Sequence, residues 1–252
     1  MIRILQFVEL TLNKTHEYSF LTKINFRSKY MKNKYNIEEL TNLAEKGDIL
    51  AQRTLADCYY DGIDVKQDYT KAYEWYSRIV EQQKDSEVLR RIGVYFYQNN
   101  EYKKAIDLWR ESAKKGNSKA YRNLGNCYYN GEGVLQNYKE AFELYTIAAE
   151  LGDDVAQYNL AYCYYSGEGV NKNEEMSFMW YKKAAEQGLV DAQYNLALRY
   201  LKGEGITQNY EKAAEWAEKA AKQGDKEAKK LLRHIQKYNL TEKYSTSNQY
   251  LS

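Results

Sequence analysis

The sequence predicts an all-α fold, a right-handed α/α superhelical solenoid of stacked antiparallel helix pairs. Three observations predict it. One pattern of 36 residues recurs along the chain, and apolar residues within each copy are spaced three and four residues apart, as on one face of an α-helix. The chain of 252 residues also contains no proline, so nothing in it interrupts a helix.

The repeated pattern is clearest in the three copies that begin at Ala120, Ala156 and Ala192, 36 residues apart. These copies read AYRNLGNCYYNGEGV, AQYNLAYCYYSGEGV and AQYNLALRYLKGEGI. An earlier copy begins at Ala51 and a further copy begins at Val88. The copy at Val88 lacks four loop residues, which is why it starts 32 residues before Ala120.

Each copy is interpreted as two helices joined by a loop. In the first helix Ala120, Leu124 and Tyr128 lie one turn apart on a single face. The residue after the leucine is small, which would let a neighbouring helix approach closely; these residues are Ala56, Gly93, Gly125, Ala161 and Ala197. Paired loop glycines such as Gly131 and Gly133 suit a backbone with positive φ.

The second helix also carries an apolar stripe at helical spacing. In the copy at Ala120 the stripe consists of Tyr138, Ala141, Leu144, Tyr145, Ala148 and Ala149. One helix pair cannot bury its own apolar face, whereas stacked pairs form a continuous core. Residues 37–46 align with a second helix and residues 226–237 with a first helix, so we expect them to cap a solenoid that spans residues 36–238.

The two ends of the chain lack the repeat. Residues 1–35 could be an extra cap, a docking segment or disordered, and residues 239–252 are expected to be a disordered tail. The first ten residues make a poor export signal, because their apolar stretch is short and broken by Gln6 and Glu9. No apolar run approaches the roughly 20 residues that cross a bilayer. We therefore expect a cytoplasmic protein without a membrane span.

The charge balance argues against a nucleic-acid partner. The chain has 37 basic and 35 acidic residues, a net charge of +2, whereas a protein that holds a phosphate backbone along its length is usually more basic. The repeated GEGV loops lack the GK[ST] ending of a phosphate-binding loop, and no strand precedes them. We interpret these loops as structural.

Catalytic and metal-binding patterns are missing from the sequence. The histidines, His16 and His234, stand near opposite ends, and neither has a nucleophile at a recognised spacing. Cys58, Cys127 and Cys163 occupy one position in three first helices, and stacked helices lie about 8–10 Å apart. That distance exceeds the limit of about 7 Å for a disulfide, so we expect reduced packing residues. We expect no enzyme activity, no cofactor and no metal site.

The full pattern resembles a known family. It reads A-x-x-x-L-G/A-x-x-Y-x-x-G-x-G-V, followed by a Tyr-x-x-Ala helix and a terminal Ala-Ala-Glu-x-Gly, and it is similar to the Sel-one-like repeat, a relative of the tetratricopeptide repeat with a longer loop. The resemblance covers about residues 37–237, although the copy at Val88 has lost both loop glycines. It implies a non-catalytic adaptor or scaffold for protein–protein interaction.

A cysteine-rich, secreted branch of this family closes each repeat with a disulfide from the end of one helix pair to the start of the next. At the matching places this chain has Ala149 with Gln157 and Ala185 with Gln193, so the bridges are missing. Members of that branch have been discussed as binding penicillin-like molecules, which leaves penicillin-binding or hydrolase-type activity as an alternative. Single-stranded RNA binding is another, because some helical-hairpin repeats read one base per repeat.

The resemblance also indicates where a partner would bind. In tetratricopeptide-type superhelices the first helices line a concave groove, and positions two and five residues from the repeated leucine face that groove. Counted in this way, the predicted partner-binding residues are Arg53, Asp57, Tyr60, Arg90, Tyr97, Arg122, Asn126, Tyr129, Tyr158, Tyr162, Tyr165 and Tyr194.

These residue types suggest the chemistry of the partner. Arginine binds carboxylates with two parallel hydrogen bonds, and tyrosine gives a large contact area at a small cost in entropy. We expect a monomer that binds a protein or peptide, with an acidic portion of the ligand near Arg53, Arg90 and Arg122. The apolar portion would lie near a group of tyrosines, namely Tyr158, Tyr162, Tyr165 and Tyr194. The alternative is that the tyrosines pack between helices and the arginines pair with nearby acidic residues.

Overall fold

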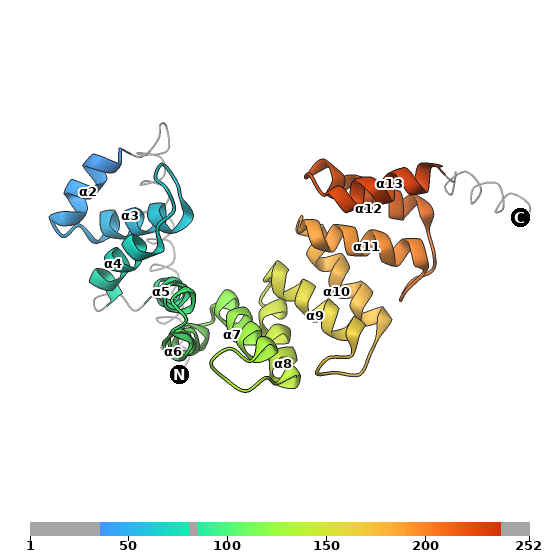
Figure 1. Cartoon of the computed structure of the whole chain (residues 1–252), viewed down its shortest axis with the longest axis horizontal. Helices are drawn as coiled ribbons and strands as arrows, with labels where there is room; N and C mark the ends of the chain where they lie inside the picture. The colour runs from blue at the N-terminus through green and yellow to red at the C-terminus, as the bar shows by residue number, and fades with distance from the viewer. Residues whose placement is uncertain (1–35, 81–84, 238–252) are drawn as a thin grey trace, which may run out of the picture. The chain divides into compact units, whose positions relative to one another are not determined.

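The computed structural model describes residues 36–80 and 85–237, and these ranges contain twelve α-helices and no strand (Figure 1). The all-α fold of stacked antiparallel helix pairs that the sequence predicts is confirmed. The expected N-terminal extension, residues 1–35, and the expected tail, residues 239–252, lie outside the described residues. The chain divides into two compact units, residues 1–84 and 85–252, which we call unit 1 and unit 2.

Unit 1 contains three described helices, α2 (Ile37–Glu45), α3 (Ile49–Asp61) and α4 (Tyr69–Val80). Each of them packs on the next along the chain. Their buried faces meet in a small core of aliphatic and aromatic side chains, among them Leu40, Leu55, Tyr76 and Ile79.

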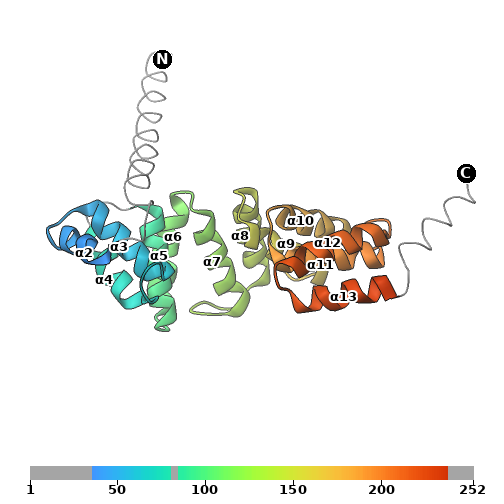
Figure 2. The ribbon, with the colours of Figure 1, turned by 90° about the horizontal axis from the view of Figure 1, so that it is seen from above.

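Unit 2 is a row of nine described helices in which each helix packs on the next (Figures 1 and 2). They are α5 (Ser86–Gln98), α6 (Tyr102–Lys114), α7 (Ser118–Asn130), α8 (Tyr138–Glu150), α9 (Asp154–Ser166), α10 (Glu174–Glu186), α11 (Val190–Lys202), α12 (Tyr210–Lys222) and α13 (Lys226–Lys237). The odd-numbered helices from α5 to α11 are the first helices of their repeats. Two first helices of neighbouring repeats, α7 and α9, also meet directly.

Short polar side chains begin most of these helices. The carboxylate of Asp153 accepts the backbone N–H of Ala156 at 2.7 Å, and the carboxamide oxygen of Asn209 accepts that of Lys212 at 2.8 Å. Such caps occupy N–H groups that have no partner inside the helix, and each stabilises a helix by about 1 kcal/mol. The local sequence therefore determines where the helices start.

The second glycine of the loop after α9 is required because the loop backbone passes close to another helix. Gly169 has a φ of +75°, and a Cβ atom placed on it would lie 2.1 Å from the carbonyl oxygen of Tyr138, at the start of α8. The loop after α9 therefore lies directly against the second helix of the preceding repeat. The prediction that these glycines adopt positive φ for structural reasons is confirmed.

The small residue after the repeated leucine receives an aromatic ring from the second helix. A Cβ atom on Gly125 would lie 2.6 Å from Cε1 of Tyr145, and one on Gly93 would lie 2.4 Å from Nε1 of Trp109. In two other repeats of unit 2 this position is a fully buried alanine, at Ala161 and Ala197. The small residue therefore lets an aromatic ring of the second helix pack directly against the backbone of the first helix.

Buried glutamines join successive repeats of unit 2. The Nε2 atom of Gln157 donates to the carbonyl oxygen of Ala149 at 3.2 Å, and that of Gln193 donates to Ala185 at 3.3 Å. These are the two pairs of positions at which the cysteine-rich branch would carry its disulfides. In this chain a side-chain hydrogen bond thus stands where that branch would have a disulfide. The side chain of Gln223 adds a second hydrogen bond, because its Nε2 atom donates to Oε1 of Gln193 at 2.9 Å.

We expect Gly125→Ala to destabilise the protein. Helix propensity alone would favour alanine by about 1 kcal/mol, but the new methyl group would overlap the Tyr145 ring. Overpacking of this kind costs about 1–3 kcal/mol, so the net loss in the free energy of unfolding should reach about 2 kcal/mol, to be measured by urea denaturation. The control is Lys119→Ala on the exposed face of α7, with an expected change within about 0.5 kcal/mol. A gain in stability of about 1 kcal/mol in Gly125→Ala would show that the ring moves aside at no cost and would contradict the prediction.

Candidate functional site

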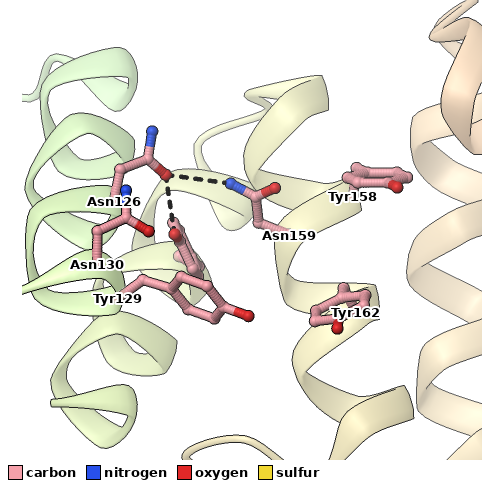
Figure 3. A pocket seen from close by; sticks show the side chains of 7 residues that line it. Asn126, Tyr129, Asn130, Tyr158, Asn159 and Tyr162 are labelled. Atoms are coloured by element: carbon pink, nitrogen blue, oxygen red, sulfur yellow. Dashed lines mark hydrogen bonds between the residues drawn. The ribbon is translucent and has the colours of Figure 1, made fainter. Parts of the chain in front are cut away.

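A pocket of about 300 Å³ opens between the first helices α7 and α9 of unit 2 (Figure 3). Its lining residues are Asn126, Tyr129 and Asn130 of α7, Tyr145 of α8, and Tyr158, Asn159 and Tyr162 of α9. All seven side chains are uncharged, since three are carboxamides and four are phenols. The pocket therefore offers neutral hydrogen bonding and aromatic contact.

Asn126 is held in place by hydrogen bonds from two directions. Its Oδ1 atom accepts the phenol O–H of Tyr145 at 2.8 Å and the Nδ2 group of Asn159 at 3.4 Å (Figure 3). Burial raises the pKa of Tyr145 above that of an ordinary phenol, which is itself a protonated donor at neutral pH. Unit 1 has the same arrangement, because the phenol of Tyr76 donates to Asp57.

Two of the predicted tyrosines connect neighbouring repeats. The phenol of Tyr129 donates to Oε2 of Glu168 at 2.7 Å, and that of Tyr97 donates to Oε2 of Glu132 at 2.7 Å. Each glutamate lies in the GEG loop of the following repeat. Burial and the hydrogen bond to the glutamate both raise the pKa of these phenols. Tyr97 and Tyr129 thus contact the following repeat, as the structural alternative expects, and Tyr129 also lines the pocket, while a role of either in partner binding stays a prediction.

The ring of Tyr165 contacts an arginine, whereas Tyr97 and Tyr129 donate hydrogen bonds to glutamates. Arg199 occupies the position that cysteine has in the two preceding repeats, and its side chain is almost fully buried. The guanidinium pairs with Glu204 of the same repeat and lies 4.0 Å from the centre of the Tyr165 ring. Tyr165 therefore presents one ring face to a cation of the next repeat.

The predicted arginines of unit 2 are already paired with carboxylates. Arg90, which is 7% exposed, donates to Glu87 from Nε at 2.9 Å and from Nη2 at 2.6 Å. The Nε atom of Arg122 lies 2.8 Å from Oδ1 of Asp153, whose side chain is buried. Both arginines thus pair with nearby acidic residues, as the structural alternative expects, while their role in binding a partner stays a prediction. Arg53 is half-buried on α3, in unit 1.

The structure brings four residues of the predicted set together in the pocket, namely Asn126, Tyr129, Tyr158 and Tyr162. The others in unit 2 lie outside its lining; they are Arg90, Tyr97, Arg122, Tyr165 and Tyr194. Arg53, Asp57 and Tyr60 belong to unit 1. Their placement on a shared binding surface remains a prediction.

Three pocket residues were missed by the sequence analysis, namely Asn130, Tyr145 and Asn159. Tyr145 lies on a second helix, and the register rule considered first helices only. Asn159 could have been found, because an asparagine directly precedes the leucine in three consecutive copies, at Asn123, Asn159 and Asn195.

The cysteines do not form a reactive site. Cys58, Cys127 and Cys163 are buried and unbridged, as the sequence predicts. Burial raises the pKa of Cys127 and Cys163 to about 12, so little reactive thiolate forms near neutral pH. Among the described residues no group of three or more His, Cys, Asp or Glu side chains could hold a metal ion. None of the helices in these ranges is long and apolar enough to cross a membrane.

Comparison with known families finds the same repeat five times. The family model of the Sel1 repeat, which is the Sel-one-like repeat, matches residues 49–83, 89–117, 118–153, 154–189 and 190–225. No curated protein matches the sequence.

Two solved structures illustrate the similarity. One is a protective antigen present in uropathogenic Escherichia coli strains that displays an SLR fold; it is 32% identical, with a TM-score of 0.68. The alignment covers 81% of this chain and 44% of the antigen, so this chain spans less than half of the antigen's length. The other is a Sel1 repeat protein from Oxalobacter formigenes, 27% identical with a TM-score of 0.65, and the alignment covers 77% of this chain and 86% of that protein.

We expect Glu87→Gln to change how stability depends on pH. Burial acts to raise the pKa of Glu87, but Arg90, Arg91 and Asn117 outweigh it and lower the pKa from 4.5 to about 2. A carboxylate with a lowered pKa in the folded state stabilises the fold above its unfolded pKa and loses this effect as pH falls. Glu87→Gln should therefore cost about 2 kcal/mol of unfolding free energy at pH 7. The difference from the wild type should shrink between pH 4.5 and about 2.

Urea denaturation across this pH range checks the prediction, with the exposed Glu143→Gln as the matched control. A difference that stayed constant down to pH 2 would mean that the charge of Glu87 contributes nothing to the fold.

Proposed function

This chain belongs to the Sel1 repeat family, and we propose that it is a non-catalytic scaffold that holds an extended segment of a partner protein along α7 and α9. The family fold, which is related to the tetratricopeptide repeat, typically serves protein–protein interaction. The observation that supports the finer proposal is the uncharged pocket lined by carboxamides and phenols.

The carboxamides of the pocket match the hydrogen-bonding groups of a peptide backbone. Asn159 donates to Asn126 through Nδ2, which leaves its Oδ1 atom to accept a backbone N–H. Asn130 likewise donates to Glu132 through Nδ2 at 3.2 Å and keeps an acceptor oxygen. Side-chain amides that are already oriented by the protein bind a peptide at a lower entropy cost than mobile ones.

The phenol rings would contact the side chains of the bound segment. Tyr162 is 39% exposed beside the pocket, and the ring of Tyr158 packs edge-on against Tyr181 at 5.4 Å between centroids. A volume of about 300 Å³ is at the small end for ligand pockets, so it suits one apolar or aromatic side chain. We propose that the rest of the segment continues over Tyr165 and Tyr194.

An acidic portion of the ligand beside Arg90 and Arg122 would have to replace existing ion pairs. It would compete with Glu87 for the first arginine and with Asp153 for the second. Asp153 also caps α9, so displacing it would weaken that helix. The proposed contact is therefore centred on the neutral pocket, and the acidic portion is a secondary element of it.

We expect the purified chain to select linear peptides with an apolar or aromatic residue from a library displayed on phage. Tyr162→Ala and Asn159→Ala should each weaken binding of a selected peptide about tenfold, because each removes a contact inside the pocket. Titration calorimetry measures the loss, and Met179→Ala, which removes a half-exposed side chain on α10, is the control.

Two outcomes would count against this proposal. Selection of no peptide would reject peptide binding, and full affinity in both pocket variants would place the interface elsewhere. Acidic residues in the selected peptides, together with weaker binding at high salt, would support the acidic portion.

A further inference from the structure

The last helix of unit 2, α13, separates apolar and basic residues onto opposite faces. Ala228 and Ile235 are fully buried, and α13 packs on α12 (Figures 1 and 2). The opposite face carries four exposed cations, which we call the basic stripe: Lys226, Lys229, Lys230 and Arg233. Overall α13 has five lysines and arginines and one acidic residue, a net charge of +4, while the whole chain has +2. The positive charge of unit 2 is thus concentrated on α13, while residues 1–35 also carry a net charge of +5.

The neighbouring helix α12 has three glutamates and three lysines, and its glutamates lie along one face. Glu211, Glu215 and Glu218 are exposed and lie four and three residues apart, on one face of the helix; we call them the acidic stripe. They line a hollow of about 480 Å³ between α12 and α13, together with Leu232 and Gln236 of α13. Two adjacent helices therefore expose stripes of opposite sign to solvent. One member of each stripe is also paired within its own helix, Glu218 with Lys222 at 2.7 Å and Lys230 with Glu227 at 2.7 Å.

The two stripes have the same length. The acidic stripe runs from Glu211 to Glu218 and the basic stripe from Lys226 to Arg233, and the two ends of each stripe are seven positions apart. At 1.5 Å per residue each extends about 10 Å along its helix. The basic stripe of one molecule can therefore lie along the acidic stripe of another with the charges opposite one another. A two-fold axis would make this contact twice.

Other partners fit these stripes less well. A nucleic acid is negative along its whole length, so it would meet the acidic stripe beside the basic one. A membrane-surface helix inserts its apolar face, but the apolar face of α13 is buried on α12. A second copy of this chain carries both signs at matching lengths.

We propose that α12 and α13 form a self-complementary surface through which two copies of the chain associate, with α13 of each copy against α12 of the other. This proposal revises the expectation of a monomer and goes beyond the proposed function. None of the pocket residues lies on α12 or α13, so association leaves the pocket free. A dimer would present two peptide sites and bind a partner with two copies of the segment more tightly than a monomer does.

Charge reversal of the full chain tests the proposal by sedimentation velocity in low salt. One variant reverses the basic stripe (Lys226→Glu, Lys229→Glu, Arg233→Glu) and the other reverses the acidic stripe (Glu211→Lys, Glu215→Lys, Glu218→Lys). A matched control reverses three exposed lysines on α6 and α7 (Lys103→Glu, Lys114→Glu, Lys119→Glu). Far-UV circular dichroism checks that each chain remains folded, and the two stripe variants test the surface independently.

We expect the wild type to approach twice the monomer mass as its concentration rises, and to lose this association at 0.5 M NaCl because salt screens exposed ion pairs. Each stripe variant alone should sediment as a monomer, while the control should behave as the wild type. An equimolar mixture of the two stripe variants should associate again, because both contacts become complementary. A mixture of the acidic-stripe variant with the control should contain dimers of the control alone, because one of the two contacts in a mixed dimer would be repulsive.

A wild type that is monomeric at every concentration in low salt would overturn the proposal. So would association that survives both reversals, or failure of the two stripe variants to associate when mixed. Salt-sensitive binding of random single-stranded DNA by a wild type that does not self-associate would assign the basic stripe to nucleic acid instead.

Discussion

The contact between a second-helix ring and the small residue after the repeated leucine underlies the rest of unit 2. In the repeat of α7 and α8 this contact brings Tyr145 against the backbone at Gly125. The same ring carries the phenol that donates to Asn126 in the pocket. The spacing between α7 and α8 and the position of the Tyr145 phenol in the pocket therefore both depend on this one contact. A larger residue at position 125 would disturb both.

Hydrogen bonds between repeats then set how α7 and α9 lie relative to one another. The phenol of Tyr129 holds Glu168 in the loop after α9, and the buried amide of Gln157 holds the end of α8. Because the pocket is lined from both α7 and α9, these bonds keep its walls in place before any ligand arrives. Order of this kind lowers the entropy cost of binding.

The arginines show where residue type alone is a weak guide to function. An arginine with an exposed guanidinium would suit an acidic ligand, but Arg90 and Arg122 already have carboxylate partners. The Glu87–Arg90 pair could have been predicted, because the two residues are three apart on one helix. The Arg122–Asp153 pair could not, because it joins α7 to the start of the following first helix.

The sequence by itself determined the all-α repeat fold, the helix pairs and the positions of four pocket residues, Asn126, Tyr129, Tyr158 and Tyr162. These features follow from local rules: apolar periodicity assigns a residue to a helix face, and glycine, asparagine and aspartate mark the helix ends. Only the tertiary structure decided which polar groups form hydrogen bonds and ion pairs within the fold. Hydrogen bonds and ion pairs between repeats depend on distances across helices, which periodicity along one helix does not specify.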